Sequence, residues 1–369
     1  MGDNTFGMKF NITSFGESHG KVVGVVVDGS PAGLKLDLNF IQSELDKRKP
    51  GQSKLSTTRK EPDQVEILSG IFNDKTTGAP ICLIIKNQDL DSSKYEKHRA
   101  FLRPSHVDYV ILQKYGEFAD YRGSGRFSGR ITAGFVMAGA IAKQILSRFN
   151  ISILAYTKSI GDIDDNQDYS NLSLESLTQS RVKTPVGALN IELSRKMEKE
   201  IEIAKKDKDS VGGTIRCIIN NVPPGIGGPI FNSLESNISR AIFSIPAIKG
   251  IEFGAGFNAS RMKGSEHNDP WIIKNGKIRT AKNDSGGIIG GISTGMPIIF
   301  TLAVKPTPSI GMVQKTVNIK SMKEEDVRFE GRNDPCIVPR AVVVVESIAA
   351  IVILDRLLIE GKIPSVLED

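Results

Sequence analysis

The 369-residue chain is predicted to fold as a mixed α/β protein, because short runs of β-branched residues alternate with segments of helical character. The β-branched runs include residues 22–28 (VVGVVVD), 81–86 (ICLIIK) and 298–304 (IIFTLAV). The helical segments are rich in Ala and Gly, as from Ile131 onward, or amphipathic and charged, as in Ser194–Lys208. This alternation suits helices packed on layers of sheet.

The other elements are predicted from the same local patterns. Further strands are expected at Gln64–Ile71, at Ile151–Ile160 and within DSVGGTIRCIINN and IEFGAGF. Further helices are expected at Leu38–Lys47, within FNSLESNISRAIFSIPAIKG, and in the run AVVVVESIAAIVILD, which could also be a strand followed by a helix. Between Asn11 and Gly29, a loop (ITSFGESHGK) is expected before the first strong strand. The polar segments Asp162–Ser180 and Lys263–Asn283 are expected on the surface.

Composition indicates a globular protein that binds acidic ligands. Hydrophobic residues make up 39% of the chain, and 48 Lys and Arg against 42 Asp and Glu leave a mild net charge of +6. A nucleic-acid-binding protein would place cations along a continuous face with stacking aromatic residues. Here aromatic residues are only 6% and the cations gather in glycine loops. We therefore expect small acidic ligands and no nucleic acid.

The cysteines and the apolar runs indicate the compartment. Cys82, Cys217 and Cys336 are far apart and form no CxxC motif, which favours free thiols in a reducing compartment without a disulfide or zinc. The N-terminal MGDNTFGMKFNITSF has no apolar signal core, and no stretch reaches about 18 uninterrupted apolar residues. The expected location is the cytoplasm, with no membrane partner and no metal.

The stretch from Arg103 to Ala142 gathers the groups of an anion site just before an apolar helix. Arg103 and His106 lie in a Pro-containing loop. Arginines recur at every fourth residue, and glycines between them let backbone amides approach a ligand: Arg122, Arg126, Arg130, Gly123, Gly125 and Gly129. The helix from Ile131 would point its positive dipole end back at this loop. We expect a small, multiply charged anion, although arginines at this spacing could also form a solvated helix face.

Other loops carry functional groups in Gly, Ser or Pro settings. His19 lies in GESHG, where it could also be a structural histidine, and Lys305 begins the rigid turn KPTPS, where lysine beside hydroxyls can hold a phosphate. Arg332 and Asp334 lie in GRNDPC and could instead pair with each other. The loop Arg48–Arg59 has little to bury and would be a mobile lid over an anion or a plain solvated loop. No P-loop is present, which disfavours a nucleoside triphosphate.

These motifs occur in a specific order: GESHGKVVGVVVDGSPAG, RPSHVDYV, KYGEFADYRGSGRFSGR, DSVGG, GGIIGGISTGMPI, KPTPSI and GRNDPC with the later VES. In this order and spacing they resemble the chorismate synthase family, the last enzyme of the shikimate pathway, from about Phe6 to Leu358. The resemblance implies one domain over residues 1–369, with helices between two antiparallel four-stranded sheets. It also implies a homotetramer built as a dimer of dimers.

The resemblance further implies a lyase of aromatic amino-acid biosynthesis. Members convert 5-enolpyruvylshikimate 3-phosphate to chorismate and phosphate by a 1,4-anti elimination. Reduced FMN is needed without net redox change, and the flavin supplies the difficult electronic step. NADPH would be one source of reducing equivalents, and an external flavin reductase would be the other.

The same resemblance assigns roles to residues of this chain. His106 would donate a proton to the departing phosphate, His19 would favour the reduced flavin anion, and Asp334 would assist proton transfer at flavin N5. The phosphate and two carboxylates of the substrate would be held by a set of cations: Arg48, Lys54, Arg103, Arg130 and Arg332. FMN would contact Arg126, Phe127, Ser128, Pro246, Ala247, Gly290, Lys305, Pro306, Thr307, Pro308, Ser309 and Arg332.

Some positions depart from the family pattern. The chain has GSGRFSGRIT where the family commonly has GGGRSSARET, so Phe127 replaces a serine, Gly129 an alanine and Ile131 a glutamate. Asn333 stands where His or Ser is usual, and Lys54 where arginine is common. These departures leave open a different flavin or phosphate-ligand enzyme on the same scaffold. A non-catalytic homologue is disfavoured because the proposed catalytic residues are all present.

Overall fold

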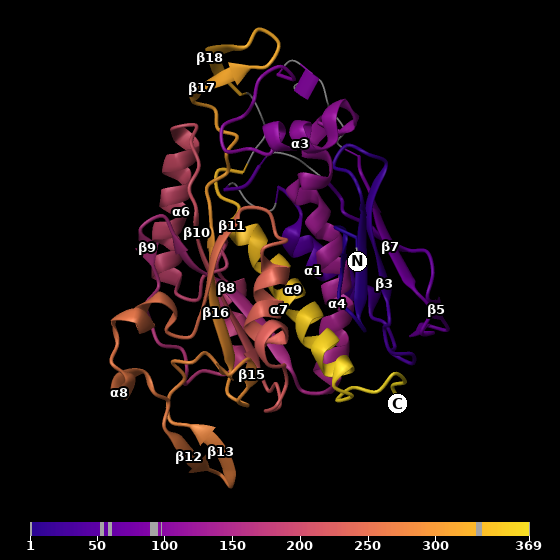
Figure 1. Ribbon diagram of the computed structural model, residues 1–369, viewed down its shortest axis with the longest axis vertical. Helices are drawn as coiled ribbons and strands as arrows, with labels where there is room; N and C mark the ends of the chain where they lie inside the picture. Colours follow the sequence, from indigo (N-terminus) through magenta and orange to yellow (C-terminus); the bar gives the residue numbers. More distant parts are fainter. Residues whose placement is uncertain are drawn as a thin grey trace.

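Two antiparallel sheets of five strands each form the main layers of the molecule (Figure 1). The computed structural model describes residues 2–51, 55–57, 61–88, 95–96, 98–329 and 334–368. The first sheet contains, in spatial order, β1 (Thr5–Phe6), β2 (Asn11–Gly16), β3 (Val22–Asp28), β7 (Ile81–Lys86) and β4 (Val65–Ile67). The second contains β11 (Ile248–Phe253), β16 (Ile298–Val304), β10 (Gly213–Asn220), β8 (Ser152–Ile160) and β9 (Ile163–Asp164).

Two long helices, α4 (Thr132–Arg148) and α9 (Val338–Ile359), lie between these sheets (Figure 1). Helix α4 packs on β2, β3 and β7, whereas α9 packs on β8 and β10, and the two helices pack against each other. Both are buried around most of their circumference, as expected for helices that are apolar on every side. Helices α1 (Leu38–Arg48) and α7 (Leu234–Ile242) flank this central pair.

The two central helices approach each other closely at Gly139 of α4. A Cβ atom added there would lie 2.3 Å from Cβ and 2.4 Å from Cα of Ser347 in α9. Close to this contact, Lys143 of α4 donates hydrogen bonds to Glu44 of α1 (2.5 Å) and to Glu346 of α9 (2.7 Å). The buried cation therefore joins three helices, since both of its carboxylate partners are themselves buried.

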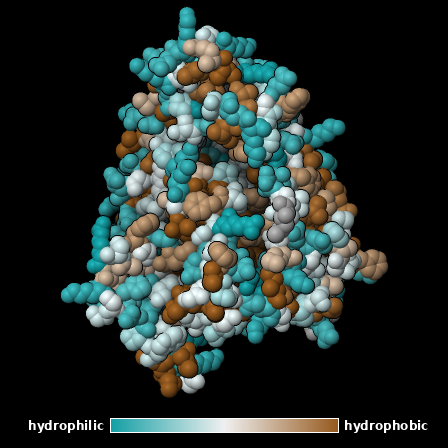
Figure 2. All heavy atoms as spheres, viewed as in Figure 1, coloured by the Kyte–Doolittle hydropathy of each residue, from teal (hydrophilic) through white to brown (hydrophobic). Residues whose placement is uncertain are grey.

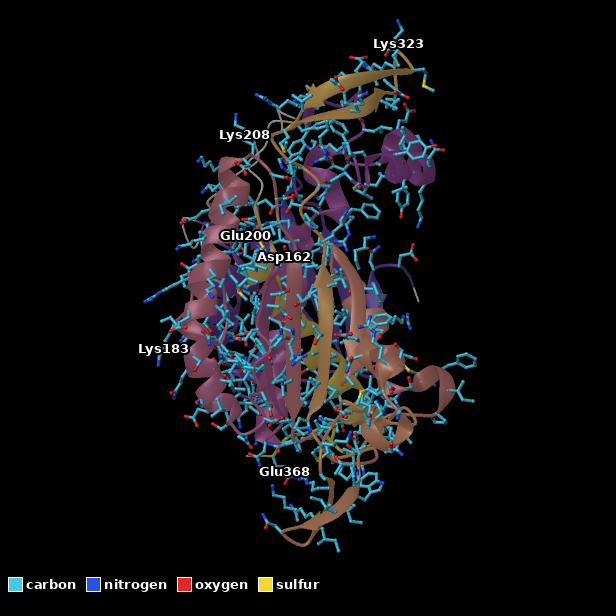
Figure 3. All side chains as sticks on the ribbon, turned by 90° about the vertical axis from the view of Figure 1, so that its left-hand side faces the viewer. Asp162, Lys183, Glu200, Lys208, Lys323 and Glu368 are labelled. Atoms are coloured by element: carbon cyan, nitrogen blue, oxygen red, sulfur yellow. The ribbon has the colours of Figure 1, made fainter. Side chains whose placement is uncertain are left out.

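The outer face of the second sheet is covered by α5 (Leu174–Val182) and α6 (Ile191–Lys206). Successive residues of β8 point to opposite faces: Leu154 and Tyr156 join a small cluster with Leu177 of α5, while Ala155 belongs to the main core. In the side view of Figure 3, Glu200 and Lys208 lie on the side formed by α6 and its end. This covering explains why β8 is buried along most of its length.

Shorter elements lie at both ends and along the sides of the molecule (Figure 1). They are α3 (Asp108–Tyr115), α8 (Gly264–His267), the 3₁₀ helices η1 (Gly116–Phe118), η2 (Arg122–Phe127), η3 (Gly129–Ile131), η4 (Ile230–Asn232) and η5 (Gly256–Arg261), and the paired strands β5 (Ile71–Phe72) with β6 (Lys75–Thr76), β12 (Trp271–Lys274) with β13 (Lys277–Thr280), β14 (Ile288–Ile289) with β15 (Ile292–Ser293) and β17 (Val313–Asn318) with β18 (Lys323–Arg328). Figure 2 shows hydrophobic side chains at the lower tip, where the β12–β13 hairpin exposes Trp271, Ile273 and Ile278. None of the helices in the described part of the chain has both the length and the apolar character required to span a membrane.

The mixed α/β class predicted from the sequence is confirmed, and most elements occur near their predicted bounds. Two strands, Ile81–Lys86 and Ile298–Val304, have the predicted bounds. Helix α1 extends the predicted Leu38–Lys47 by one residue, and the ambiguous C-terminal run is one helix, α9. The three cysteines are free.

Three expectations about the fold are wrong in detail. The main sheets have five strands each, because a two-residue edge strand, β1 or β9, extends each expected set of four. Residues 11–16 form strand β2, because they pair in register with β3, so the loop is confined to the residues between the two strands. Of the strand expected at Gln64–Ile71, only residues 65–67 pair with β7. The segment Asp162–Ser180 is mostly exposed, as expected, although it contains the start of α5, whose Leu177 is buried.

The contact at Gly139 yields a test of how tightly the central helices pack. We expect Gly139→Val to lower the free energy of unfolding by about 1–3 kcal/mol, because the added atoms overlap the backbone of α9 and force the helices apart. Denaturant unfolding measures this change. The matched control is Gly264→Val, since a Cβ at Gly264 would meet nothing within 4 Å beyond its chain neighbours and the backbone of its own helix. Equal stability of the two variants would contradict close packing at Gly139.

Candidate functional site

The candidate site lies beside α3, where several loops distant in sequence meet. Two loops meet here: the His19 loop (residues 17–21, between β2 and β3) and the glycine loop (residues 122–130). The backbone N–H of Ser18 in the first donates to the carbonyl of Gly125 in the second at 3.3 Å. Lys305, which follows β16, donates through Nζ to the carbonyl of Ser105 (2.8 Å) and through its backbone N–H to the carbonyl of Ala247 (3.0 Å). The structure therefore brings together most of the loops that the sequence marked as functional.

The glycine loop packs against the ring of His19. Gly123, Ser124 and Gly125 all have positive φ, and a Cβ added at Gly123 would lie 2.4 Å from Cδ2 of His19. Glycine is needed at residue 123 because this conformation and this approach both disfavour a side chain. His19 is 5% exposed, and its ring meets that of Tyr95 edge to face at 5.1 Å.

Asp108, the first residue of α3, holds both predicted residues of the RPSH loop. It accepts hydrogen bonds from Nδ1 of His106 (2.8 Å), and from Nε (2.8 Å) and Nη2 (2.7 Å) of Arg103. Although burial opposes ionisation, these hydrogen bonds and the nearby positive charge hold the pKa of Asp108 well below its usual range. The remaining guanidinium nitrogen of Arg103, Nη1, lies 3.5 Å from Oγ of Ser309.

The pKa of His106 is lowered from its usual value near 6.5. Burial is the main cause, and the positive charges of Arg103 and Lys305 add to it, while the bond to Asp108 partly offsets them. An ionised Asp108 keeps the proton of a neutral His106 on Nδ1. Its Nε2 atom lies 3.1 Å from Oγ of Ser124.

A second carboxylate, Asp63, binds two buried arginines at once. Its Oδ2 accepts from Nη2 of Arg48 at 2.6 Å, and its Oδ1 accepts from Nη1 of Arg130. Nε of Arg130 donates to Asn87 at 2.9 Å, and its Nη2 lies 3.8 Å from Oε2 of Glu61. Within the described residues, Nε of Arg48 and Nη2 of Arg130 are buried without a hydrogen-bond partner. Buried N–H groups of this kind are suited to an anionic ligand.

Burial also shifts the pKa values of Arg48 and Asp63. The pKa of Arg48 falls to about 10, chiefly through burial and further through the charges of Arg340 and Arg130, while Asp63 opposes the shift. Burial would raise the pKa of Asp63, but the attraction of Arg48 and Arg130 outweighs it and lowers the pKa. Arg48 and Asp63 are therefore both charged at neutral pH.

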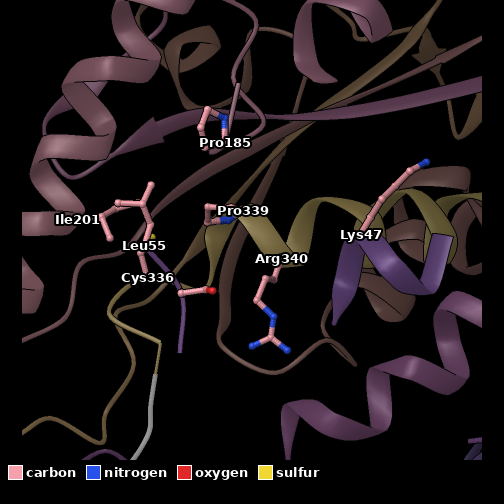
Figure 4. Close-up of a pocket in the computed structure, with 8 residues that line it drawn as sticks. Lys47, Leu55, Pro185, Ile201, Cys336, Pro339 and Arg340 are labelled. Atoms are coloured by element: carbon pink, nitrogen blue, oxygen red, sulfur yellow. The ribbon is translucent and has the colours of Figure 1, made fainter. Parts of the chain in front are cut away.

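Asp334, a predicted catalytic residue, is held from two directions. Its Oδ1 accepts from the backbone N–H of Thr57 at 2.8 Å, and its Oδ2 accepts from Nη1 of Arg340. Nε of Arg340 donates to the carbonyl of Arg48 at 2.8 Å, so this arginine joins Asp334 to the end of α1. A small cavity of about 60 Å³ lies beside Arg340 (Figure 4). Residues from several elements line it: Lys47, Leu55, Ser56, Pro185, Ile201, Cys336, Pro339 and Arg340.

Several residues expected to contact FMN form a group suited to a phosphate. Lys305 and Ser309 reach the Arg103 loop, and Oγ1 of Thr307 is buried without a hydrogen-bond partner among the described residues. Pro246 and Ala247 adjoin Lys305 through the bond to the carbonyl of Ala247. An ammonium group with hydroxyls nearby fits the chemistry of the FMN phosphate.

The other expected FMN residues differ in what they can offer. The guanidinium of Arg126 already donates to the carbonyls of Gly16 (2.9 Å) and Ser14 (3.1 Å) and to Asn4 (2.9 Å), so it fastens the glycine loop to the edge of the first sheet. Oγ of Ser128 accepts from the backbone N–H of Arg130 at 3.2 Å and caps η3. The ring of Phe127 is 44% exposed and lies 6.3 Å from that of Tyr115.

Gly290 is not brought to this group within the chain. Gly290 lies in the turn between β14 and β15, and Ile292 of β15 forms a bridge with Gly227. The carbonyl of the adjacent Gly291 accepts a hydrogen bond from the backbone N–H of Leu234, the first residue of α7. Lys305 and Ala247 lie at the opposite ends of β16 and α7. A seven-residue strand spans about 20 Å, so Gly290 is well separated from Lys305.

Three residues named in the sequence analysis, Lys54, Arg332 and Asn333, lie outside the described residues, as does part of the loop Arg48–Arg59. The structure also adds residues that the sequence reasoning missed: Asp63, Asn87, Asp108, Ser124 and Arg340. A carboxylate two residues after His106 could have been noticed as its orienting partner. Nothing in the local sequence around Asp63 indicated two arginine partners.

Comparison with known proteins agrees with this arrangement. A family model described as chorismate synthase matches residues 10–358. A chorismate synthase from Dehalococcoides mccartyi is 51% identical over 365 residues, covering 99% of both chains, and one from Korarchaeum cryptofilum is 51% identical over 358 residues, covering 97% of this chain and 98% of that one. A crystal structure of chorismate synthase aligns with a TM-score of 0.75 and 30% identity, over 96% of this chain and 93% of that one.

These matches define the chain as a lyase that acts on a phosphate ester. It belongs to the chorismate synthase family, whose members act in the shikimate pathway.

The shared carboxylate yields a test of the arginine cluster. We expect Asp63→Asn to lower the free energy of unfolding by about 3–5 kcal/mol, because two buried guanidinium groups lose their common counter-charge. The lowered pKa of Asp63 means that its stabilising effect is present above about pH 4 and is lost as the pH falls through the folded-state pKa. Denaturant unfolding at neutral and acidic pH measures both effects.

The matched control for this test is Asp46→Asn. Asp46 pairs with Lys49 at 2.9 Å but its side chain is 45% exposed, so its loss should cost about 1 kcal/mol or less. If Asp63→Asn were no less stable than this control, the counter-charge role of Asp63 would be wrong.

Proposed function

We propose that the chain converts 5-enolpyruvylshikimate 3-phosphate to chorismate and phosphate by 1,4-anti elimination with reduced FMN and no net redox change. It would act as one domain over residues 1–369, in a cytoplasmic homotetramer built as a dimer of dimers. Its membership of the chorismate synthase family over nearly its whole length supports this proposal. NADPH or an external flavin reductase would supply the reduced flavin.

The observation that carries the proposal is the presence of buried or half-buried cations in two places, Arg103 beside His106, and Arg48 with Arg130 on Asp63. Arg103 keeps Nη1 free of Asp108, and Arg48 and Arg130 keep buried N–H groups that have no hydrogen-bond partner among the described residues. A substrate with one phosphate and two carboxylates offers anionic oxygens for such groups. Lys54 and Arg332 would complete the substrate site.

FMN would be held by the group around Lys305, whose ammonium and neighbouring hydroxyls suit its phosphate. Pro246, Ala247, Pro306 and Pro308 would shape the pocket, with Arg126, Phe127, Ser128, Gly290 and Arg332 as further contacts. When bound, reduced FMN would supply electron density to the allylic system that loses the phosphate. Because Gly290 is distant from Lys305 within one chain, it would meet the flavin only from another subunit.

The catalytic residues of the proposal are His106, His19 and Asp334. His106 would act as a general acid toward the departing phosphate, since the negative charge of the bound substrate would raise its lowered pKa. Asp334, fixed by Arg340 and the amide of Thr57, would assist the transfer of the proton that the substrate loses. His19, packed against Gly123, would lie at the flavin edge and favour its reduced anion.

The proposal is tested by anaerobic turnover of 5-enolpyruvylshikimate 3-phosphate with FMN reduced by dithionite, following chorismate and phosphate. We expect turnover by the wild type and a fall in kcat of about 10²- to 10⁴-fold in His106→Ala, because the general acid is lost. His19→Ala and Asp334→Asn are expected to lower kcat in the same direction. Replacing dithionite with NADPH shows whether the chain reduces its own flavin.

The control for these variants is His267→Ala, which removes a histidine of the surface helix α8. Binding of reduced FMN, measured by absorbance titration, should be kept in His106→Ala. A wild-type protein that binds reduced FMN but forms no chorismate would overturn the proposed function. Near wild-type turnover by folded His106→Ala would overturn the role of His106 alone.

A further inference from the structure

Ser124 lies at the centre of the glycine loop in a conformation that a residue with a side chain rarely adopts. Its φ is 68° and its ψ is 13°, between two glycines that also have positive φ. Serine has no special tolerance for this region, which favours glycine. The side chain is therefore held at an unfavourable position, and residues in such conformations cluster at active sites.

The hydroxyl of Ser124 is positioned by two residues of the proposed site. Its Oγ lies 3.1 Å from Nε2 of His106 and 3.4 Å from Nη2 of Arg103. On its other side, His106 is bonded through Nδ1 to Asp108 at 2.8 Å. Asp108, His106 and Ser124 thus form one continuous chain of hydrogen bonds, and Ser124 is 6% exposed.

Both ring nitrogens of His106 are therefore engaged within the protein. With Asp108 ionised, Nδ1 keeps its proton, and Nε2 of neutral His106 accepts the hydroxyl proton of Ser124. When Nε2 becomes protonated, it donates to Oγ, and the hydroxyl proton of Ser124 is free to point elsewhere. A proton from His106 can then reach a ligand through Ser124 without any movement of the imidazole.

We propose that Ser124 is a further catalytic residue, which relays the proton of His106 to the departing phosphate. As the carbon–oxygen bond of the substrate breaks, its electron pair stays on the phosphate oxygen. That oxygen takes the hydroxyl proton of Ser124, and Oγ takes the proton from Nε2 of His106. His106 ends neutral with Nδ1 still bonded to Asp108, so protons and electrons balance. This inference rests on the proposed function and adds a residue that the family resemblance did not name.

The charges that face His106 fit a relay in this direction. Arg103 and Asp108 face it from its own loop and α3, and Lys305 faces it from the turn after β16. The two cations favour loss of the proton from His106 and attract the phosphate that receives it. Asp108 fixes the orientation of the ring that passes the proton on.

The test compares Ser124→Gly with wild type in single turnovers of 5-enolpyruvylshikimate 3-phosphate on dithionite-reduced FMN. Glycine tolerates the positive φ, so the loop should fold while the hydroxyl is lost. We expect the rate of phosphate release to fall about 10- to 100-fold, with less than about a threefold change in KM. The rate is also measured in mixtures of light and heavy water. If two protons move in the transition state, the wild-type rate should depend on the deuterium content along a curve. In Ser124→Gly only one proton moves, so the rate should depend on the deuterium content linearly.

Two further measurements separate the relay from a structural role. Asn275→Gly is the matched control, because Asn275 also has a positive φ (52°) but lies in the β12–β13 turn, at the opposite end of the molecule from α3 (Figure 1). It should keep the wild-type rate and the curved dependence. Nitrogen-15 NMR of His106 without substrate should show a changed Nε2 signal and pKa in Ser124→Gly, as expected if the hydrogen bond exists.

The outcomes distinguish this inference from the proposed function. An active wild type with an equally fast Ser124→Gly, or with the same curved dependence in both, would overturn the relay and leave the function intact. An unchanged Nε2 signal in Ser124→Gly would also overturn it. A wild type that binds reduced FMN but forms no chorismate would overturn the function, and the relay with it.

Discussion

The arrangement of the site depends on one buried contact, the pairing of Asp63 with both Arg48 and Arg130. Two guanidinium groups at such short range repel each other strongly when they are withdrawn from water, so neither would stay buried without a shared counter-charge. The same contact ties the end of α1 to the start of α4, since Arg48 closes the first helix and Arg130 precedes the second. The candidate ligand site therefore lies at the junction of α1 and α4.

The dipoles of α1, α4 and α9 also contribute to the electrostatic field at this junction. Arg48 is at the C-terminus of α1, where a cation is favoured, and Arg340 and Asp334 lie at the N-terminal end of α9. The N-termini of α4 and α9 both meet this region, because Arg130 and Arg340 are each linked to Arg48. Burying two apolar helices between sheets therefore also directs two positive helix ends toward the candidate anion site.

Local sequence patterns were sufficient for the long elements and insufficient for contacts between distant residues. In Ile298–Val304 the β-branched and aromatic residues indicate a strand, and the long Ala- and Gly-rich apolar run of α4 indicates a helix. Strands β1 and β9 have two residues each, too few for any period to appear. Family motifs placed His106 and Arg103 in one loop, but the pairing of Thr57 with Asp334, 277 residues apart, follows from the tertiary fold alone.

The arginines of the glycine-loop region show why residue type alone does not define a binding role. Arg126 and Arg130 are four residues apart and were both expected to touch a ligand, yet their partners differ. Arg126 donates to carbonyl, amide and hydroxyl oxygens, so its hydrogen bonds are satisfied while its charge remains available as a long-range field. In Arg130, by contrast, the charge is compensated by Asp63, whereas one N–H group is left over. Its buried Nη2 has no hydrogen-bond partner in the described part of the chain. Arg130 is therefore better suited than Arg126 to direct contact with an anion, and Arg126 is better suited to attraction from a distance.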